Sequence, residues 1–204
     1  MKLTQVKNHF RQNDPLIFQV LVKMKFQLLT SLEADRGIYF RKLCGEIISQ
    51  QLAGKAAEAI FNRFVKLMPS VSFTPKAVLS VPDQALRDVG LSWAKVKYIK
   101  DLADKVTRRL VKLDHLQTLA DEAVVAELVK VKGIGLWTAE MFLIFTLGRE
   151  NIFSHGDLGL RNALIKLYRL RRSPTVARVN KIVNRWSPFK SYGSLALWHS
   201  LDNR

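Results

Sequence analysis

The sequence predicts an all-α protein with about ten helices. Apolar residues recur at helical spacing along almost the whole chain, and no window sustains the alternation of apolar and polar residues that is typical of a half-buried strand. Glycine and proline residues separate the helical stretches. Because the chain has 204 residues, of which 48% are hydrophobic, it can bury a full core, either as one domain or as two closely packed lobes.

In the first half of the chain, Asp14-Pro15 marks a helix start, with Asp as the N-cap and Pro at the first helical position. The apolar stretch that follows predicts a helix that continues to residue 29. The same spacing predicts further helices over residues 39–52, 55–68 and 93–110. Three prolines divide the region between the last two helices into short pieces, namely Pro69, Pro75 and Pro82.

In the second half, Gly133-Ile134-Gly135 forms a tight turn between two helical patterns, over residues 120–130 and 135–147. Further helices are predicted over residues 157–170, 176–186 and 192–201. Two glycines let the backbone approach a surface closely, and the start of the following helix offers free N–H donors to an anion. A phosphodiester fits this description, although such a short turn is more often a plain connection between helices.

The net charge indicates a polyanionic partner. Lys and Arg number 33 against 17 Asp and Glu, which gives a formal charge of +16. Nucleic acid is the expected partner, because it neutralises the mutual repulsion of these charges. An acidic membrane surface is the rival, but the sequence has no apolar stretch long enough to span a bilayer and does not open on a signal-peptide pattern.

Cys44 is the only cysteine, so neither a disulfide within the chain nor an iron–sulfur cluster on four cysteines can form. A reducing compartment suits this composition. We expect Cys44 to be a small buried apolar group.

Four segments follow one another along the chain: IISQQLAGKAA at 47–57, LRDVGLS at 86–92, KVKYI at 95–99 and the glycine turn through Trp137. Together they resemble the helix–hairpin–helix superfamily of DNA glycosylases, in its alkylated-base branch typified by 3-methyladenine DNA glycosylase II. The resemblance covers roughly residues 12–201. It implies a two-lobed helical bundle with a DNA-binding cleft between the lobes. Lobe A is expected over about 35–150, lobe B over about 1–34 with 151–204, and the hairpin motif over 121–147.

The resemblance places the catalytic carboxylate of the family on Asp157. Cleavage of a base from deoxyribose passes through an oxocarbenium-like sugar, which a neighbouring carboxylate stabilises while it orients or deprotonates the attacking water. On the residues alone, Asp157 is first of all an N-cap for the helix that follows. The two roles are compatible, because capping N–H groups and basic neighbours keep a carboxylate ionised.

A base within duplex DNA must be flipped out before it can be excised, and the gap must be filled. The resemblance places the intercalating loop at Gln50–Ala53, with Gln51 or Leu52 as the plug. The ordinary alternative is that Leu52 is a core residue and that the glutamines cap helix ends.

Aromatic faces suit a pocket for alkylated purines, many of which are cationic. The resemblance implies a base pocket at Trp137, Met141 and Trp198, each of which also has an ordinary reading as a core residue. Trp93 and Trp186 are assigned to packing.

At the hairpin, the N–H groups of Gly133 and Gly135 are expected to meet phosphate oxygens, with Lys130 and Lys132 adding charge. The resemblance further implies that backbone carbonyls of this turn hold a Na⁺ or K⁺ ion when DNA is bound. The matching positions are Val129, Val131 and Ile134. No other cofactor is expected.

The function implied is that of a monofunctional hydrolase of base excision repair, which excises alkylated purines such as 3-methyladenine or 7-methylguanine from damaged double-stranded DNA. Family members that also cleave the strand carry a lysine nucleophile where this chain has Trp137, so lyase activity is not expected. The alternatives are a catalytically silent protein that binds DNA structures through the hairpin, and a glycosylase/lyase for oxidised bases. A monomer is expected, located in the cytoplasm of a bacterium or archaeon, at the nucleoid, or in a nucleus.

Overall fold

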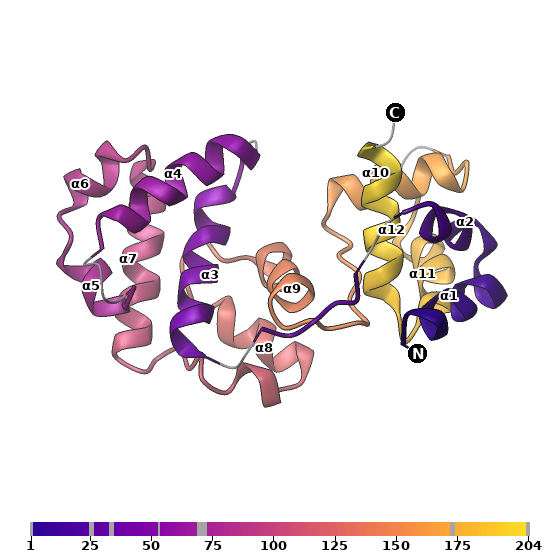
Figure 1. Cartoon of the computed structure of the whole chain (residues 1–204), viewed down its shortest axis with the longest axis horizontal. Coiled ribbons are helices and arrows are strands. Elements are labelled where there is room, and N and C mark those ends of the chain that lie inside the picture. The colour runs from indigo at the N-terminus through magenta and orange to yellow at the C-terminus, as the bar shows by residue number, and fades with distance from the viewer. Residues whose placement is uncertain are drawn as a thin grey trace. The chain divides into compact units, whose positions relative to one another are not determined.

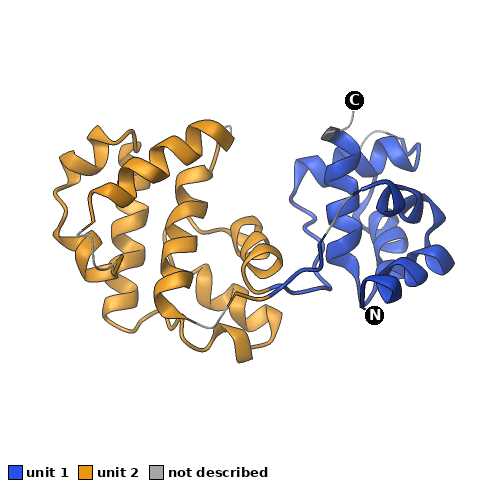
Figure 2. Ribbon diagram, in the orientation of Figure 1, with its two compact units in different colours: residues 1–30, 148–204 blue, residues 31–147 orange. Residues whose placement is uncertain are grey.

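A computed structural model describes residues 2–24, 27–32, 35–52, 54–68, 73–171 and 174–202. Within these ranges every regular element is a helix, which confirms the predicted all-α class. The chain forms two compact units, one made of residues 1–30 with 148–204 and the other of residues 31–147 (Figure 2). No helix in the described part of the chain is long and apolar enough to cross a membrane.

The 31–147 unit is built around α3 (Arg36–Ser49), which lies between α7 (Trp93–Thr107) and α9 (Leu136–Phe145) (Figure 1). Around these three are α4 (Gly54–Lys66), α5 (Pro75–Ser80), α6 (Asp83–Asp88), the 3₁₀ turn Leu116–Thr118 and α8 (Asp121–Leu128). The buried face of α3 includes Leu43, Cys44 and Ile47, each with no exposed surface. Cys44 is therefore a buried apolar group, as predicted, and burial raises the pKa of its thiol far above the usual value.

The unit of residues 1–30 and 148–204 packs α12 (Lys190–Asp202) against α10 (Leu158–Leu167) and α2 (Pro15–Lys23). It also contains α1 (Lys2–Asn13), α11 (Val176–Val183) and a 3₁₀ turn, Asn184–Trp186. Trp186 is fully buried in this core, so its assignment to packing is confirmed. Trp93 was assigned to packing wrongly: its side chain is 51% exposed, with the Arg87 guanidinium 5.1 Å from the ring centroid.

The first two helices differ from the prediction. Helix α1 was not predicted, yet Val6 and Phe10 stand four residues apart on one helical face and are both fully buried. Helix α2 ends at Lys23, not at residue 29, because the backbone becomes extended at Met24. Leu28 and Leu29 still pack on the core without being helical, and the Leu29 N–H donates to the Tyr192 hydroxyl at 3.2 Å. An apolar run can thus be buried in an extended segment as well as in a helix.

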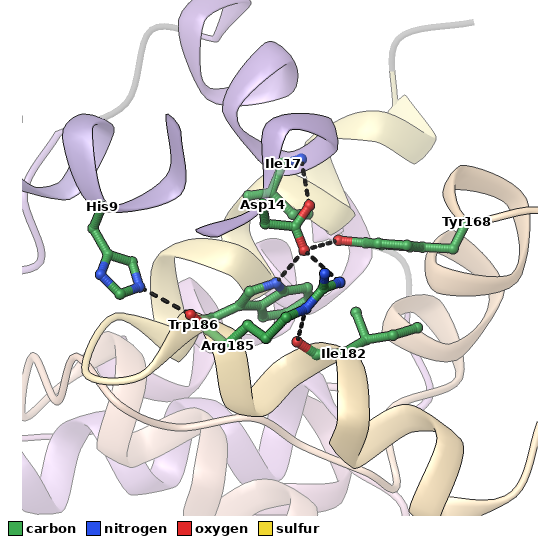
Figure 3. A network of polar contacts seen from close by, with 7 residues as sticks. All are labelled: His9, Asp14, Ile17, Tyr168, Ile182, Arg185 and Trp186. Atoms are coloured by element: carbon green, nitrogen blue, oxygen red, sulfur yellow. Dashed lines mark hydrogen bonds and ion pairs between the residues drawn. The ribbon is translucent and has the colours of Figure 1, made fainter. Parts of the chain in front are cut away.

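Asp14 joins the N-terminal helix pair to the C-terminal elements of its unit (Figure 3). Its carboxylate is 2% exposed. One oxygen caps α2 through the Ile17 N–H at 3.3 Å, and the other accepts from the Tyr168 hydroxyl at 2.6 Å and the Trp186 indole N–H at 2.8 Å. The Arg185 guanidinium, at 3.3 Å from the same oxygen, balances the charge. Asp14 is therefore a cap and also the centre of a buried polar network.

Candidate active site

Asp157 lies at the end of the segment that enters α10, where it is the N-cap of that helix. Its Oδ1 accepts a hydrogen bond from the Leu160 N–H at 2.7 Å, so the predicted capping role is confirmed. The residue is 8% exposed. The carboxylate thus lies at the positive end of the helix dipole, where a negative charge is stabilising.

A second donor reaches the same oxygen from α12. The indole N–H of Trp198 lies 3.1 Å from Asp157 Oδ1. Gly159 lies against both groups: a Cβ at this position would stand 3.1 Å from Asp157 Oδ1 and 3.4 Å from the Trp198 ring. The small residue therefore leaves room for the carboxylate and the indole to meet in the first turn of α10.

His155 precedes this cap and faces a different environment. Its ring packs edge-on against Phe153, with centroids 5.1 Å apart. Partial burial and the charge of Lys190 lower the pKa of His155 below its usual value, while a hydrogen bond with Asn180 acts in the opposite direction. The neutral form of the imidazole is therefore favoured. The ring lines a cavity of about 140 Å³ together with Phe153 and Arg161.

The hairpin lies in the 31–147 unit, between α8 and α9, and Gly133 is essential to its turn. The backbone at Gly133 has φ +82°, a left-handed conformation that favours glycine. A Cβ there would overlap the ring of Tyr98. Gly135 has φ −97° and caps α9, and a Cβ there would meet nothing within 4 Å. Within the described residues the N–H groups of both glycines have no hydrogen-bond partner, so they can donate to an anion.

An aspartate on α7 fixes the path of the hairpin. Asp101 Oδ2 accepts from the backbone N–H of Lys132 at 2.8 Å and from Lys105 Nζ at 2.7 Å. Lys105 also donates to the Lys130 carbonyl at 2.6 Å. Burial alone would raise the pKa of the Asp101 carboxyl, but these hydrogen bonds and the two lysine charges lower it below its usual value. The sequence pattern did not indicate Asp101, which is 31 residues from Lys132.

The two predicted phosphate-binding lysines differ in their surroundings. The Lys130 ammonium is ion-paired with Glu127, whose carboxylate also accepts the backbone N–H of Lys112 at 2.7 Å. Lys132 is exposed, and its charge contributes to lowering the pKa of Asp101. The charge of Lys130 is therefore largely balanced within the hairpin, and Lys132 has the more accessible charge.

The loop after α3 is tied to the hairpin by Gln50. Its side-chain amide donates to the Gly133 carbonyl at 2.8 Å and to the Thr138 hydroxyl at 3.3 Å. The ammonium of Lys95 donates to the carbonyls of Ile48 and Gln50, at 2.8 and 2.7 Å, and so caps the end of α3. Nothing in the sequence indicated either contact, because both join residues that are more than 40 positions apart.

Gln51 and Leu52, the two predicted plug residues, form the tip of this loop, and both are exposed. Gln51 has φ +59°, which is uncommon for a residue with a side chain. Leu52 is 38% exposed, so the alternative that it is a core residue is wrong. Ala53 lies outside the described residues.

The predicted pocket residues are divided between the two units. Trp137 in the first turn of α9 is 41% exposed, whereas Met141, one turn later, is 5% exposed. Trp198 belongs to the other unit, with Asp157. In the predicted cation site, the side chains of Val131 and Ile134 are buried, and the Val131 carbonyl accepts the Ile134 N–H at 3.1 Å. Val129 is 42% exposed.

Comparison with known proteins identifies the family. Residues 44–189 match the HhH-GPD superfamily base excision DNA repair protein. The DNA-3-methyladenine glycosylase 1 of Schizosaccharomyces pombe is 34% identical over 87% of this chain and 79% of its own length.

Two solved structures are similar over 97% of this chain. The 3-methyladenine DNA glycosylase of S. pombe in complex with abasic DNA has a TM-score of 0.82 at 28% identity, with 97% of that chain covered. The DNA-3-methyladenine glycosidase of Bacillus halodurans has a TM-score of 0.81 at 32% identity, with 89% covered. The chain thus belongs to the HhH-GPD superfamily of base excision DNA repair proteins and is a DNA glycosylase.

Proposed function

We propose that this DNA glycosylase flips alkylated purines, such as 3-methyladenine or 7-methylguanine, out of double-stranded DNA and removes them by hydrolysis, with Asp157 as the catalytic residue. The observation that carries the proposal is the placement of Asp157, a nearly buried carboxylate held at a helix N-terminus by two donors. The substrate class is supported by the names of the relatives.

The chemistry requires a negative charge beside the sugar. As the N-glycosidic bond breaks, its electron pair leaves with the purine, and positive charge develops on the sugar. The Asp157 carboxylate stabilises that charge. A water molecule then bonds to C1′ and releases a proton, which the carboxylate accepts. A purine that is already cationic leaves as a neutral base, so the reaction needs less assistance than the removal of a normal base.

Other residues divide the remaining tasks. The N–H groups of Gly133 and Gly135 bind backbone phosphates, assisted by Lys132. Gln51 or Leu52 fills the gap left by the flipped nucleotide. Trp137 offers an aromatic face to a cationic base, and Met141 forms a softer wall beside it.

We also propose that a monovalent cation binds at the same turn. Each backbone carbonyl oxygen has two lone pairs, so the Val131 carbonyl can bind a cation while it accepts the Ile134 N–H. The carbonyls of Val129, Val131 and Ile134 are the proposed ligands, and the ion would strengthen phosphate binding at the hairpin. Replacement of K⁺ by a large organic cation at equal ionic strength is expected to weaken binding to abasic DNA. Equal affinity in the two salts would remove the cation from the proposal.

The enzyme is proposed to act without strand cleavage, because the indole of Trp137 cannot form a Schiff base with the sugar. It is proposed to act as a monomer, in the compartment that holds the cell's DNA.

An excision assay on methylated duplex DNA tests the substrate and the reaction together. Released bases are identified by mass spectrometry, and strand breaks are scored before and after alkali. We expect free 3-methyladenine and 7-methylguanine, with breaks after alkali only. Breaks before alkali, with a borohydride-trapped adduct, would instead establish a lyase. Duplex binding with no released base would support the silent DNA-binding alternative.

A further inference from the structure

The ring of Trp198 and its N–H group contact different parts of the unit. One part of the ring packs on the core of its unit, so the indole is held in place. Its N–H donates to Asp157 Oδ1 at 3.1 Å. The family resemblance implied that Trp198 is an aromatic wall of the base pocket, and the alternative was an ordinary core residue. Neither role uses the N–H group.

The hydrogen bond constrains the carboxylate where the helix cap alone does not. A single hydrogen bond from the Leu160 N–H to Oδ1 tolerates a range of rotation of the carboxyl group about its bond to Cβ, because this torsion has only a broad preference. A second donor to the same oxygen, from another helix, narrows that range. Because electrostatic stabilisation depends on the distance between the carboxylate and the developing charge, a fixed orientation benefits the reaction.

We propose that Trp198 is a positioning residue of the reaction, whose indole N–H holds the Asp157 carboxylate in the orientation that faces the sugar of the flipped nucleotide. The inference rests on the proposed function, in which Asp157 is the catalytic residue. Through this hydrogen bond Trp198 would increase the rate of bond cleavage, whether or not its ring also stacks on the base.

Two variants remove the donor and keep the ring. Trp198→Phe retains an aromatic face. Replacement of Trp198 by 3-benzothienylalanine, through amber suppression, retains the shape of the indole with sulfur in place of N–H. The second variant also covers the case in which the smaller Phe ring destabilises the unit. Trp93→Phe is the matched control, because Trp93 is an exposed tryptophan of the other unit.

The readout is the single-turnover rate of 7-methylguanine excision, with affinity for abasic duplex measured in parallel. Both donor-free variants are expected to lose about tenfold to a hundredfold in rate, the range for a hydrogen bond to a charged group. Affinity for abasic DNA is expected to stay unchanged. A merely structural role for Trp198 would instead lower the rate and the affinity together.

A wild-type excision rate in the benzothienyl variant would overturn the positioning role and leave Trp198 as a pocket wall. Asp157→Asn, assayed alongside, separates this outcome from failure of the proposed function. If Asp157→Asn is inactive and the donor-free variants are not impaired, only the role of Trp198 falls. If Asp157→Asn still excises the base, the catalytic role of Asp157 falls, and the role of Trp198 falls with it.

Discussion

Gly133 and Gly135 stand two residues apart in the hairpin, but a side chain would meet very different surroundings at each. At Gly133 a methyl group would overlap Tyr98 in a left-handed backbone conformation. We expect Gly133→Ala to lower the free energy of unfolding by about 2 kcal/mol, measured by denaturant titration. A loss well below about 1 kcal/mol would mean that the turn tolerates a side chain.

Gly135→Ala is the matched substitution, because a Cβ at Gly135 has open space and an ordinary backbone conformation. Stability is expected to change by less than about 0.5 kcal/mol. Affinity for abasic DNA is nevertheless expected to fall, since the methyl group would stand between the backbone N–H and a phosphate. Wild-type affinity in a fluorescence anisotropy titration would exclude Gly135 from the phosphate contact.

Asp14 and Asp157 both cap helices, and helix-capping patterns alone do not separate a structural cap from the proposed catalytic one. Their hydrogen-bond partners differ: Asp14 accepts from Tyr168 and Trp186 inside the core, whereas Asp157, the proposed catalytic residue, accepts from Trp198. Asp14→Asn replaces an acceptor oxygen with an NH₂ donor and leaves buried donors unmatched. We expect a loss of about 3 kcal/mol in the free energy of unfolding, followed by circular dichroism. A loss below about 1 kcal/mol would contradict this account of the network.

Helices and their order were largely predictable, because each depends on local spacing, caps and glycine or proline breaks. The predicted helix bounds are wrong at Leu28 and Leu29, because these side chains are partly buried in a segment that is not helical. Helix α1 was not predicted, because it is polar and buries only Val6 and Phe10. Contacts between distant elements were not predictable from the pattern. Gln50 and Asp101, which hold the hairpin from two different helices, are the clearest cases.

The attachment of the hairpin to α7 gives a pH-dependent prediction. The pKa of Asp101 is lowered in the folded state, so its contribution to stability is complete above the unfolded-state value near 3.8 and is lost as the pH falls through the lower folded value. Asp101→Asn is expected to lower the free energy of unfolding by about 1 kcal/mol at pH 7, because two hydrogen bonds are lost in a partly solvated site. Below about pH 3 the loss is expected to be smaller.

Asp104→Asn is the control for this prediction, because Asp104 lies on the same helix in an exposed ion pair with Arg108 at 3.3 Å. It is expected to leave stability unchanged within about 0.5 kcal/mol. Hydrogen exchange at the Lys132 amide gives a local readout. If Asp101→Asn does not accelerate that exchange, Asp101 does not anchor the hairpin.

For the whole molecule, the charge of +16 predicts DNA affinity that depends steeply on salt. Affinity for a non-specific duplex is expected to fall about tenfold or more between about 50 and 200 mM salt. Lys132→Ala is expected to reduce the slope of log affinity against log salt by about one, because one phosphate contact is lost. Lys76→Ala on α5, a matched change of charge, is expected to leave the slope unaltered. Equal slopes in the two variants would exclude Lys132 from the phosphate contact.

The net charge indicated a polyanionic partner, with nucleic acid expected, and the motifs indicated the family and, with it, DNA. The residues that position the site, in contrast, could be identified only from the three-dimensional structure. Asp157 and Trp198 belong to one unit, and the hairpin with Trp137 and Met141 to the other, although all of them come from the second half of the sequence. Asp157 and Trp198 are 41 positions apart, and no periodic signal in the sequence indicates the hydrogen bond that joins them.

The most direct test of the central claim is base release by Asp157→Asn compared with its binding to duplex DNA. Asn keeps an oxygen for the Leu160 N–H and the Trp198 indole but has no charge for the sugar cation. The account predicts that excision of 7-methylguanine is lost in single-turnover assays, while affinity for abasic duplex stays within about twofold of wild type. Excision at the wild-type rate in this variant would contradict it.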